Sequence, residues 1–248
     1  MKRSSGNRLP ALCCAAAFAM LAAAGAKGEV VERTATVNGT TVHYKVVLPD
    51  GFDPAKTYPA ILAFGGGPQT METVDGLLRR NLRAEAEKRG YLVIAPAAPA
   101  EGLFFEGGAR IFPAFLDRIL ADYHVEGGRF HVAGPSNGGI AAFHVAAANP
   151  RYFRSVTAFP GYMWRPSEEK LDAIAGMCVF MYVGESDPYM WHDEMKREAD
   201  VLRSKGAVAR YTVEKGQAHR LQSLAGENAG RLFDGFDEAR KGCGARPE

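Results

Sequence analysis

Between residues 58 and 213, short apolar runs alternate with segments of helical periodicity, and this alternation constrains the fold more than any other feature of the sequence. The runs that predict strands cover residues 58–64, 91–95, 129–133, 155–159, 178–183 and 209–213. The segments that predict helices cover residues 75–88, 109–123, 139–148 and 188–204, a broken pattern over 221–240, and a helix that begins at Ser167. Apolar strands without polar alternation are buried on both faces, as in a parallel sheet covered by helices. The chain therefore predicts an α/β fold with a doubly wound, mostly parallel sheet.

An N-terminal β-hairpin precedes this region. Residues Val30–Val37 and Thr41–Leu48 are rich in β-branched side chains and flank Asn38-Gly39, a dipeptide that favours the positive φ of a tight hairpin turn. A chain of 248 residues with 23% charged and 10% aromatic residues is typical of a globular protein with one sizeable core. We predict a single domain over residues 27–248.

The first 26 residues resemble a signal peptide. Lys2, Arg3 and Arg8 precede the apolar run of residues 9–24, and Ala24-Gly25-Ala26 fits the small-x-small pattern of a cleavage site. The alternative is a retained membrane anchor, but the run is shorter than the roughly 20 apolar residues that span a bilayer. We expect cleavage after Ala26 and an exported protein, periplasmic or secreted, without membrane association after cleavage.

Charge and cysteine content narrow the classes of partner. Removing residues 1–26 takes away three of the 30 basic residues and none of the 28 acidic ones, which leaves a net charge of −1. No dense Lys/Arg run predicts nucleic-acid binding. Cys178 and Cys243 would be the only cysteines left after export; a disulfide between them and a buried free thiol at Cys178 are both open. Neither cysteine has the spacing of a metal site, and no metal or organic cofactor is predicted.

The pentapeptide Gly134-Pro135-Ser136-Asn137-Gly138 matches G-x-S-x-G, the nucleophile elbow. It stands between a predicted strand and a predicted helix, as the motif requires. A sharp turn at this junction lifts the serine hydroxyl above the sheet edge, and glycines allow the neighbouring chain to approach it. The alternative is a glycine-rich turn with an idle serine.

A serine hydroxyl needs a base to become a good nucleophile, and the base needs an acid to orient it. With the chain order Ser, acid, His, we predict His219, in a loop after the strand 209–213, as the base; His192 lies on a predicted helix and is the alternative. The strand 178–183 is followed by Glu185 and Asp187, and we prefer Asp187 as the acid, although its position also suits a helix N-cap.

A tetrahedral transition state also needs hydrogen-bond donors for its oxyanion. One expected donor is the backbone N–H of Asn137, directly after the serine. The other is expected from the Gly65-Gly66-Gly67 turn that follows the strand 58–64. Gly66 and Gly67 are both candidates, with Gly67 favoured. The turn is not a phosphate-binding P-loop, because the Lys-Ser/Thr of that motif is absent.

With these motifs the chain resembles the α/β-hydrolase superfamily, and within it exported esterases of the polyhydroxybutyrate depolymerase and feruloyl esterase type. The likeness rests on residues 123–129, on the elbow with Gly139, and on Asn149-Pro150-Arg151-Tyr152-Phe153. It implies the α/β-hydrolase fold and ester hydrolysis by Ser136, His219 and Asp187. The chain departs from such families where they commonly carry His-Gly before the oxyanion residue, since it has Gly65-Gly66.

Aromatic residues after two predicted strands suggest a substrate pocket. Phe104 and Phe105 follow the strand 91–95, while Tyr162 and Trp164 follow the strand 155–159. Without an insertion long enough for a large lid, we expect short-chain, aromatic or polymer-linked esters as substrates. Two alternatives remain: a small serine peptidase or amidase with the same triad, and a noncatalytic binding protein.

Overall fold

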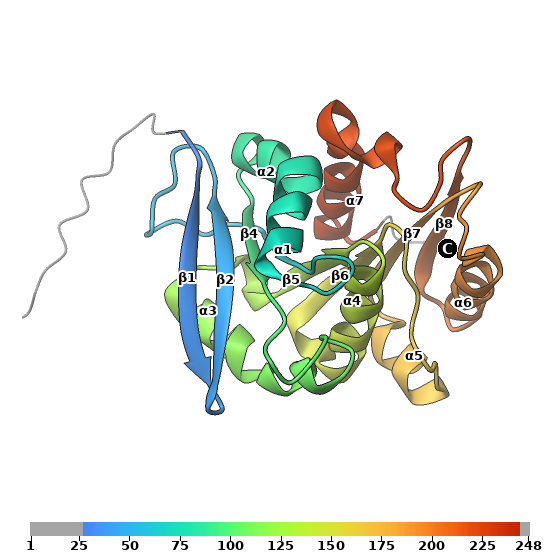
Figure 1. The fold of residues 1–248 in the computed structure, drawn as a ribbon, viewed down its shortest axis with the longest axis horizontal. Coiled ribbons are helices and arrows are strands. Elements are labelled where there is room, and N and C mark those ends of the chain that lie inside the picture. Colours follow the sequence, from blue (N-terminus) through green and yellow to red (C-terminus); the bar gives the residue numbers. More distant parts are fainter. Residues whose placement is uncertain (1–26, 244–248) are drawn as a thin grey trace, which may run out of the picture.

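A computed structural model of the protein describes residues 27–243, so the predicted signal peptide lies outside the described residues. Eight strands form one sheet in the order β1-β2-β4-β3-β5-β6-β7-β8 (Figure 1). The strands are β1 (Glu29–Val37), β2 (Thr40–Leu48), β3 (Ala60–Ala63), β4 (Leu92–Pro96), β5 (Phe130–Gly134), β6 (Phe153–Ala158), β7 (Cys178–Gly184) and β8 (Val208–Glu214). The six strands from β4 to β8 in this order are parallel. The mostly parallel sheet is therefore confirmed.

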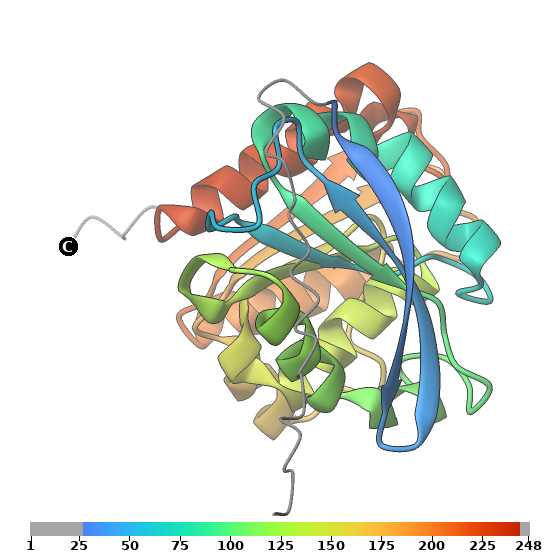
Figure 2. The ribbon, with the colours of Figure 1, turned by 90° about the vertical axis from the view of Figure 1, so that its left-hand side faces the viewer.

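The predicted hairpin forms the antiparallel edge of the sheet. Strands β1 and β2 pair over their whole length, and β2 in turn runs antiparallel to β4. Asn38 and Gly39 close the turn with φ of 49° and 79°, the left-handed conformation that this dipeptide favours. Figure 2 shows the hairpin in front of the twisted sheet.

Helices cover both faces of the sheet. The α-helices are α1 (Met71–Leu77), α2 (Arg83–Arg89), α3 (Ala114–Asp122), α4 (Asn137–Ala148), α5 (Glu168–Ile174), α6 (His192–Ser204) and α7 (Gly230–Arg240). Helices α1, α2 and α7 pack on one face, where they share one core cluster with the sheet (Figure 1). Helices α3 to α6 pack on the other face and enclose the larger cluster. The sheet is thus doubly wound, as predicted.

Three predicted helices have different limits in the structure. The segment predicted over 75–88 runs from Met71 to Arg89, with a π-helical stretch η1 (Leu78–Leu82) between α1 and α2. The helix predicted over 109–123 is divided into a 3-10 turn (Gly107–Ile111) and α3. The helix predicted over 188–204 begins only at His192, because Met190 has a φ of 57° that no right-handed helix contains.

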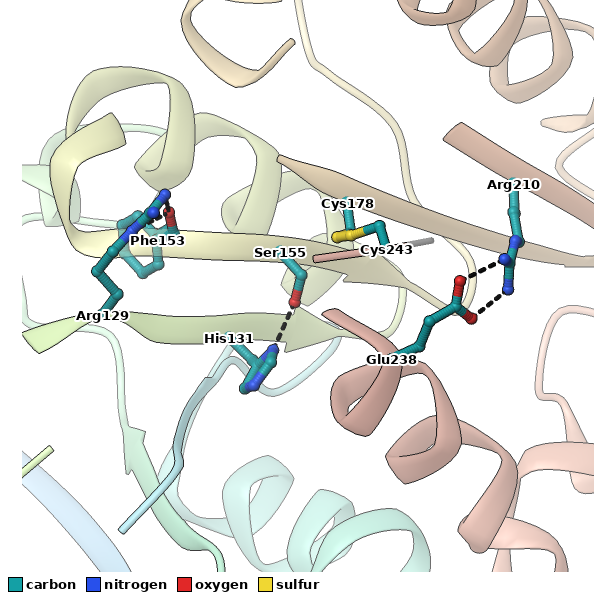
Figure 3. Close-up of a disulfide and its surroundings, with 8 residues drawn as sticks. All are labelled: Arg129, His131, Phe153, Ser155, Cys178, Arg210, Glu238 and Cys243. Atoms are coloured by element: carbon teal, nitrogen blue, oxygen red, sulfur yellow. Dashed lines mark hydrogen bonds and ion pairs between the residues drawn. A yellow bond between two sulfur atoms is a disulfide. The ribbon is translucent and has the colours of Figure 1, made fainter. Parts of the chain in front are cut away.

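A disulfide links Cys178, at the start of β7, to Cys243, just beyond α7 (Figure 3). The two Cα atoms are 6.0 Å apart, within the usual range for a disulfide. Of the two alternatives for Cys178, the structure therefore has the disulfide and not the buried free thiol. Nearby, Arg210 of β8 pairs with Glu238 of α7, which adds a second tie between this helix and the sheet.

Among residues 27–243, no helix has the length and apolar character needed to cross a membrane.

Candidate active site

Ser136 stands in the sharp turn between β5 and α4. Its φ is 56° and its ψ is −126°, a conformation that costs a non-glycine residue about 1–3 kcal/mol. The turn is possible because its neighbours lack side chains: a Cβ on Gly138 would lie 2.2 Å from the carbonyl oxygen of Phe64. The chain after β3 and the start of α4 are therefore in direct contact. This is the geometry expected of a nucleophile elbow.

Three side chains predicted from separate loops form one hydrogen-bonded series. The Nε2 of His219 lies 2.9 Å from the Oγ of Ser136, and its Nδ1 lies 2.8 Å from Oδ2 of Asp187. The Asp187 side chain is fully buried, whereas that of His219 is 21% exposed. With a proton on Nδ1, the imidazole donates to the carboxylate and presents Nε2 to the serine hydroxyl as an acceptor. This arrangement can remove a proton from Ser136.

The carboxylate of Asp187 is held by the turn that follows β7. Its Oδ1 accepts a hydrogen bond from the backbone N–H of Tyr189 at 2.9 Å, so both carboxylate oxygens are engaged. Helix α6 begins five residues later, at His192, with Trp191 at the N-cap position, and Asp187 is therefore not its N-cap.

The residues named as alternatives take other places. Glu185 accepts a hydrogen bond from the backbone N–H of Gly216 at 2.9 Å, and the N–H of Ser186 donates to the carbonyl of Gln217 at 2.8 Å. Both bonds fasten the loop that carries His219 to the end of β7. His192 is the first residue of α6 and its backbone carbonyl accepts from Tyr211.

The expected oxyanion donors lie on both sides of Ser136. In the described part of the chain, no hydrogen bond uses the backbone N–H of Asn137, Gly66 or Gly67. The Asn137 side chain donates to the carbonyl of Gly67 at 2.9 Å, which ties the glycine turn to the elbow. Gln69, fully buried, adds a second tie through Nε2, which lies 3.3 Å from the carbonyl of Asn137. These hydrogen bonds hold the glycine turn and the elbow together beside the hydroxyl of Ser136.

A cavity of about 580 Å³ opens above Ser136 and His219. Its lining comes from the glycine turn, from α1 and η1, and from the chain around His219. The imidazole is also flanked by two aromatic rings, with centroids 4.5 Å away for Tyr189 and 5.0 Å for Trp191. A ligand with an acyl and an alcohol part has room in this cavity.

The four aromatic residues predicted to bind substrate lie elsewhere. Phe104 is fully buried in the core, with its ring centroid 4.8 Å from that of Phe64, and Phe105 packs against the same core. Tyr162 and Trp164 line a second cavity of about 220 Å³ beside α6. Only Tyr162 approaches the site indirectly, through an edge-on contact with Trp191 at 5.1 Å.

Several residues of the site had no clear signal in the sequence. Trp191 and Tyr189 follow the acid in the chain, so their proximity to it was the only available clue. Gln69 lies two residues after the glycine turn, in a segment without the periodic apolar pattern from which burial can be predicted. Three arginines also line the cavity, and the sequence predicts a role in the site for none of them: Arg79 and Arg80, in the segment predicted as a helix over 75–88, and Arg220, directly after His219. Within residues 27–243, no cluster of metal-ligating side chains is present.

The part of the chain that carries the hydrogen-bonded serine, histidine and aspartate is similar in sequence to known proteins. Residues 113–233 match the Esterase family, and this span contains Ser136, Asp187 and His219. The chain is 34% identical over 138 residues to dipeptidyl-peptidase 5 of Porphyromonas gingivalis, a match that covers 51% of this chain but only 20% of that protein. The chain thus spans a fifth of the length of this relative.

Solved structures share the fold over nearly the whole chain. A ferulic acid esterase superposes with a TM-score of 0.65 at 18% identity, covering 88% of this chain and 99% of that one. A thermostable carboxylesterase cloned from a metagenomic library also gives a TM-score of 0.65, at 20% identity, covering 89% and 91% of the two chains. The chain therefore has the α/β-hydrolase fold, and its sequence matches support a serine hydrolase.

Proposed function

We propose that this protein hydrolyses carboxylic esters through an acyl-enzyme, with Ser136 as nucleophile, His219 as general base and Asp187 as the residue that orients the imidazole. The observation that carries the proposal is the series of two hydrogen bonds, 2.9 Å and 2.8 Å long, from Ser136 through His219 to a fully buried Asp187. The match to the Esterase family supports ester hydrolysis.

In the first half of the reaction, the Oγ of Ser136 attacks the ester carbonyl while Nε2 of His219 takes its proton. The bond to the alcohol then breaks, and the imidazolium returns the proton to the departing alkoxide. In the second half, a water molecule attacks the acyl-serine with the same help from His219, which releases the acid and restores the serine. The carboxylate of Asp187 stabilises the imidazolium in both halves.

The backbone N–H of Asn137 and that of Gly66 or Gly67 donate to the negatively charged carbonyl oxygen of the tetrahedral intermediate, because none of these groups has another acceptor among the described residues. Donors fixed in place before the reaction stabilise such an oxyanion more than mobile water does, because they need no reorganisation. Asn137 and Gln69 hold these two backbone segments together, so they act as positioning residues.

A peptide substrate is the second candidate, because the sequence relatives that match this chain include dipeptidyl-peptidase 5. The same three side chains cleave amides by the same steps. The fold of the solved neighbours does not distinguish the two substrates.

Serine-dependent turnover tests the proposal. We expect the protein to hydrolyse 4-nitrophenyl acetate and butyrate and to react with a fluorophosphonate probe, and Ser136→Ala to lose both properties while keeping its melting temperature. Turnover of dipeptidyl anilides but not of esters would favour the second candidate. A protein that neither labels nor turns over any of these substrates would be a noncatalytic member of the fold.

We also propose that the protein is exported. Residues 1–26 carry the features of a signal peptide, and a disulfide persists mainly in oxidising compartments such as the periplasm. N-terminal sequencing of the protein from the fractionated producing cell tests this: an N-terminus at Lys27 supports cleavage and export, and an intact Met1 in the cytoplasmic fraction contradicts both.

A further inference from the structure

The cavity above Ser136 and His219 contains three arginines: Arg79, Arg80 and Arg220. Among the described residues, none of the three takes part in an ion pair or a side-chain hydrogen bond. Neighbouring arginines behave differently, since Arg83 on α2 pairs with Glu87 at 2.7 Å. Among residues 27–243, Glu72 is the only acidic residue in the lining; it is exposed and has no arginine within ion-pair distance. The cavity therefore has a net positive charge.

The arginines come from two segments that the fold brings together. Arg79 and Arg80 lie in the π-helical stretch η1, a distortion that often occurs at functional sites. The buried Asn81 fixes this stretch, because its Nδ2 donates to the carbonyl of Leu224 at 2.7 Å. Arg220 directly follows His219 in the loop after β8 and lines the same cavity. The cluster is thus built on the same framework as the serine and the histidine.

The direction of the pKa shift of Arg80 agrees with this arrangement. Burial, followed by the nearby guanidinium groups of Arg220 and Arg79, lowers the pKa of Arg80 below its ordinary value. Like charges held near one another without a carboxylate repel, and an anion bound in the cavity would relieve that repulsion. Guanidinium groups suit this role, since their planar donors match the oxygens of a carboxylate or phosphate.

We propose that Arg79, Arg80 and Arg220 bind an anionic group of the substrate, so that the protein prefers esters that carry a carboxylate or phosphate away from the scissile bond. This inference rests on the proposed ester hydrolysis and specifies its substrate class. Half-esters of dicarboxylic acids and acyl esters of hydroxy acids both belong to this class. The first places the charge on the acyl side and the second on the alcohol side.

Two pairs of esters, each with one anionic and one neutral member of similar size, test the inference through hydrolysis of the nitrophenyl or acetoxy ester bond. On the acyl side, mono-4-nitrophenyl adipate is compared with 4-nitrophenyl hexanoate. On the alcohol side, 4-acetoxybenzoate is compared with its methyl ester. The quantity measured is the ratio of kcat/KM for the anionic and the neutral member of each pair, in the wild type, in Arg80→Gln, in Arg220→Gln and in the control Arg83→Gln. Comparing the ratio between variants cancels the different intrinsic reactivities of the esters.

We expect the ratio for at least one pair to fall by about tenfold to a hundredfold in Arg80→Gln and Arg220→Gln, as for the loss of a hydrogen bond to a charged group. It should stay within twofold in Arg83→Gln and should decrease with added salt in the wild type. Whichever pair responds identifies the side of the ester that the arginines contact. Arg220 is exposed, so its variant keeps the test valid if Arg80→Gln fails to fold.

Two other outcomes separate this inference from the proposed function. Serine-dependent hydrolysis with the same ratio in the wild type, Arg80→Gln and Arg220→Gln would leave the esterase in place and overturn the anion site. If no ester is hydrolysed, the proposed function fails, and calorimetric titration with adipate decides the anion site alone. Equal affinity, or no binding, in the wild type and both variants would then overturn it.

Discussion

Gly184, the last residue of β7, controls the position of His219 through a backbone contact. A Cβ on this residue would lie 2.1 Å from the carbonyl oxygen of Ala218 and 2.5 Å from that of Gln217. Real Cβ atoms essentially never approach other atoms closer than 3.0 Å, so Gly184→Ala must push the loop outward by roughly 1 Å. His219 follows Ala218 directly and should move with it.

A shift of that size is large compared with the tolerance of the site. The Nε2–Oγ distance is 2.9 Å, and an additional 1 Å removes the hydrogen bond between His219 and Ser136. A misplacement of about 1 Å costs about a hundredfold in rate, which corresponds to roughly 3 kcal/mol of activation free energy. We therefore expect Gly184→Ala to lower kcat for 4-nitrophenyl butyrate about a hundredfold.

The assay is steady-state hydrolysis combined with thermal unfolding and the rate of fluorophosphonate labelling. Gly176→Ala is the matched control, because no atom lies within 4 Å of its added Cβ and its φ is not positive. The control should keep full activity. A Gly184→Ala protein that folds and retains kcat within about threefold of the wild type would refute the reasoning, since the loop would then have adjusted without moving the histidine.

Three further predictions concern other parts of the chain. Asp187→Asn should lower kcat by roughly three to four orders of magnitude, because the amide leaves His219 in the wrong tautomer; near-normal turnover would remove Asp187 from the mechanism. Reduction of the Cys178–Cys243 disulfide, which closes a loop of 65 residues, should lower the free energy of unfolding by about 4 kcal/mol in denaturant titrations and release two thiols. Burial raises the pKa of the Glu198 carboxyl to about 8, although the hydrogen bond that the carboxyl accepts from the N–H of Met163 partly opposes this shift. At a pH between the ordinary pKa of 4.5 and this raised value, the carboxyl is protonated in the folded protein and ionised in the unfolded chain. As the pH rises from 5 to 8, the free energy of unfolding of the wild type should therefore fall relative to that of Glu198→Gln, by at most about 5 kcal/mol. A difference between the two proteins that does not change with pH would contradict the buried, protonated carboxyl.

The sequence was sufficient to predict those features that backbone conformation and burial determine locally. Strands such as β5 and β7 are mostly apolar and are buried on both faces, as in a parallel sheet between two helical layers. The elbow was predictable because glycines are required on either side of Ser136 by direct backbone contacts. His219 and Asp187 followed from the order of the strands, since loops at the carboxyl ends of parallel strands meet at one edge of the sheet.

The lining of the cavity was not predictable in the same way. Phe104 and Trp164 follow strands that end at this edge, but whether a loop side chain turns inward to the core or outward depends on contacts from distant segments. Phe104 turns inward because the buried Gln69 accepts its backbone N–H at 2.9 Å and Phe64 packs against its ring. Arg79 and Arg80 reach the cavity through a π-helical stretch that helical periodicity does not reveal.

Strand β7 connects the stability of the molecule with its chemistry, because its two ends are held by different means. Cys178 at the start is tied covalently to the segment after α7, whereas Gly184 at the end contacts the loop of His219 through backbone atoms alone. Gly184 is six residue steps along the extended strand from Cys178, a span of about 20 Å. Reduction of the disulfide acts largely on the entropy of the unfolded chain and leaves the distant end of the strand in place. The reduced protein should therefore keep its kcat at temperatures well below its lowered melting point, while Gly184→Ala should lose kcat with a smaller effect on stability. A parallel loss of both properties in both proteins would mean that β7 moves as one unit, and the separation of the two ends would be wrong.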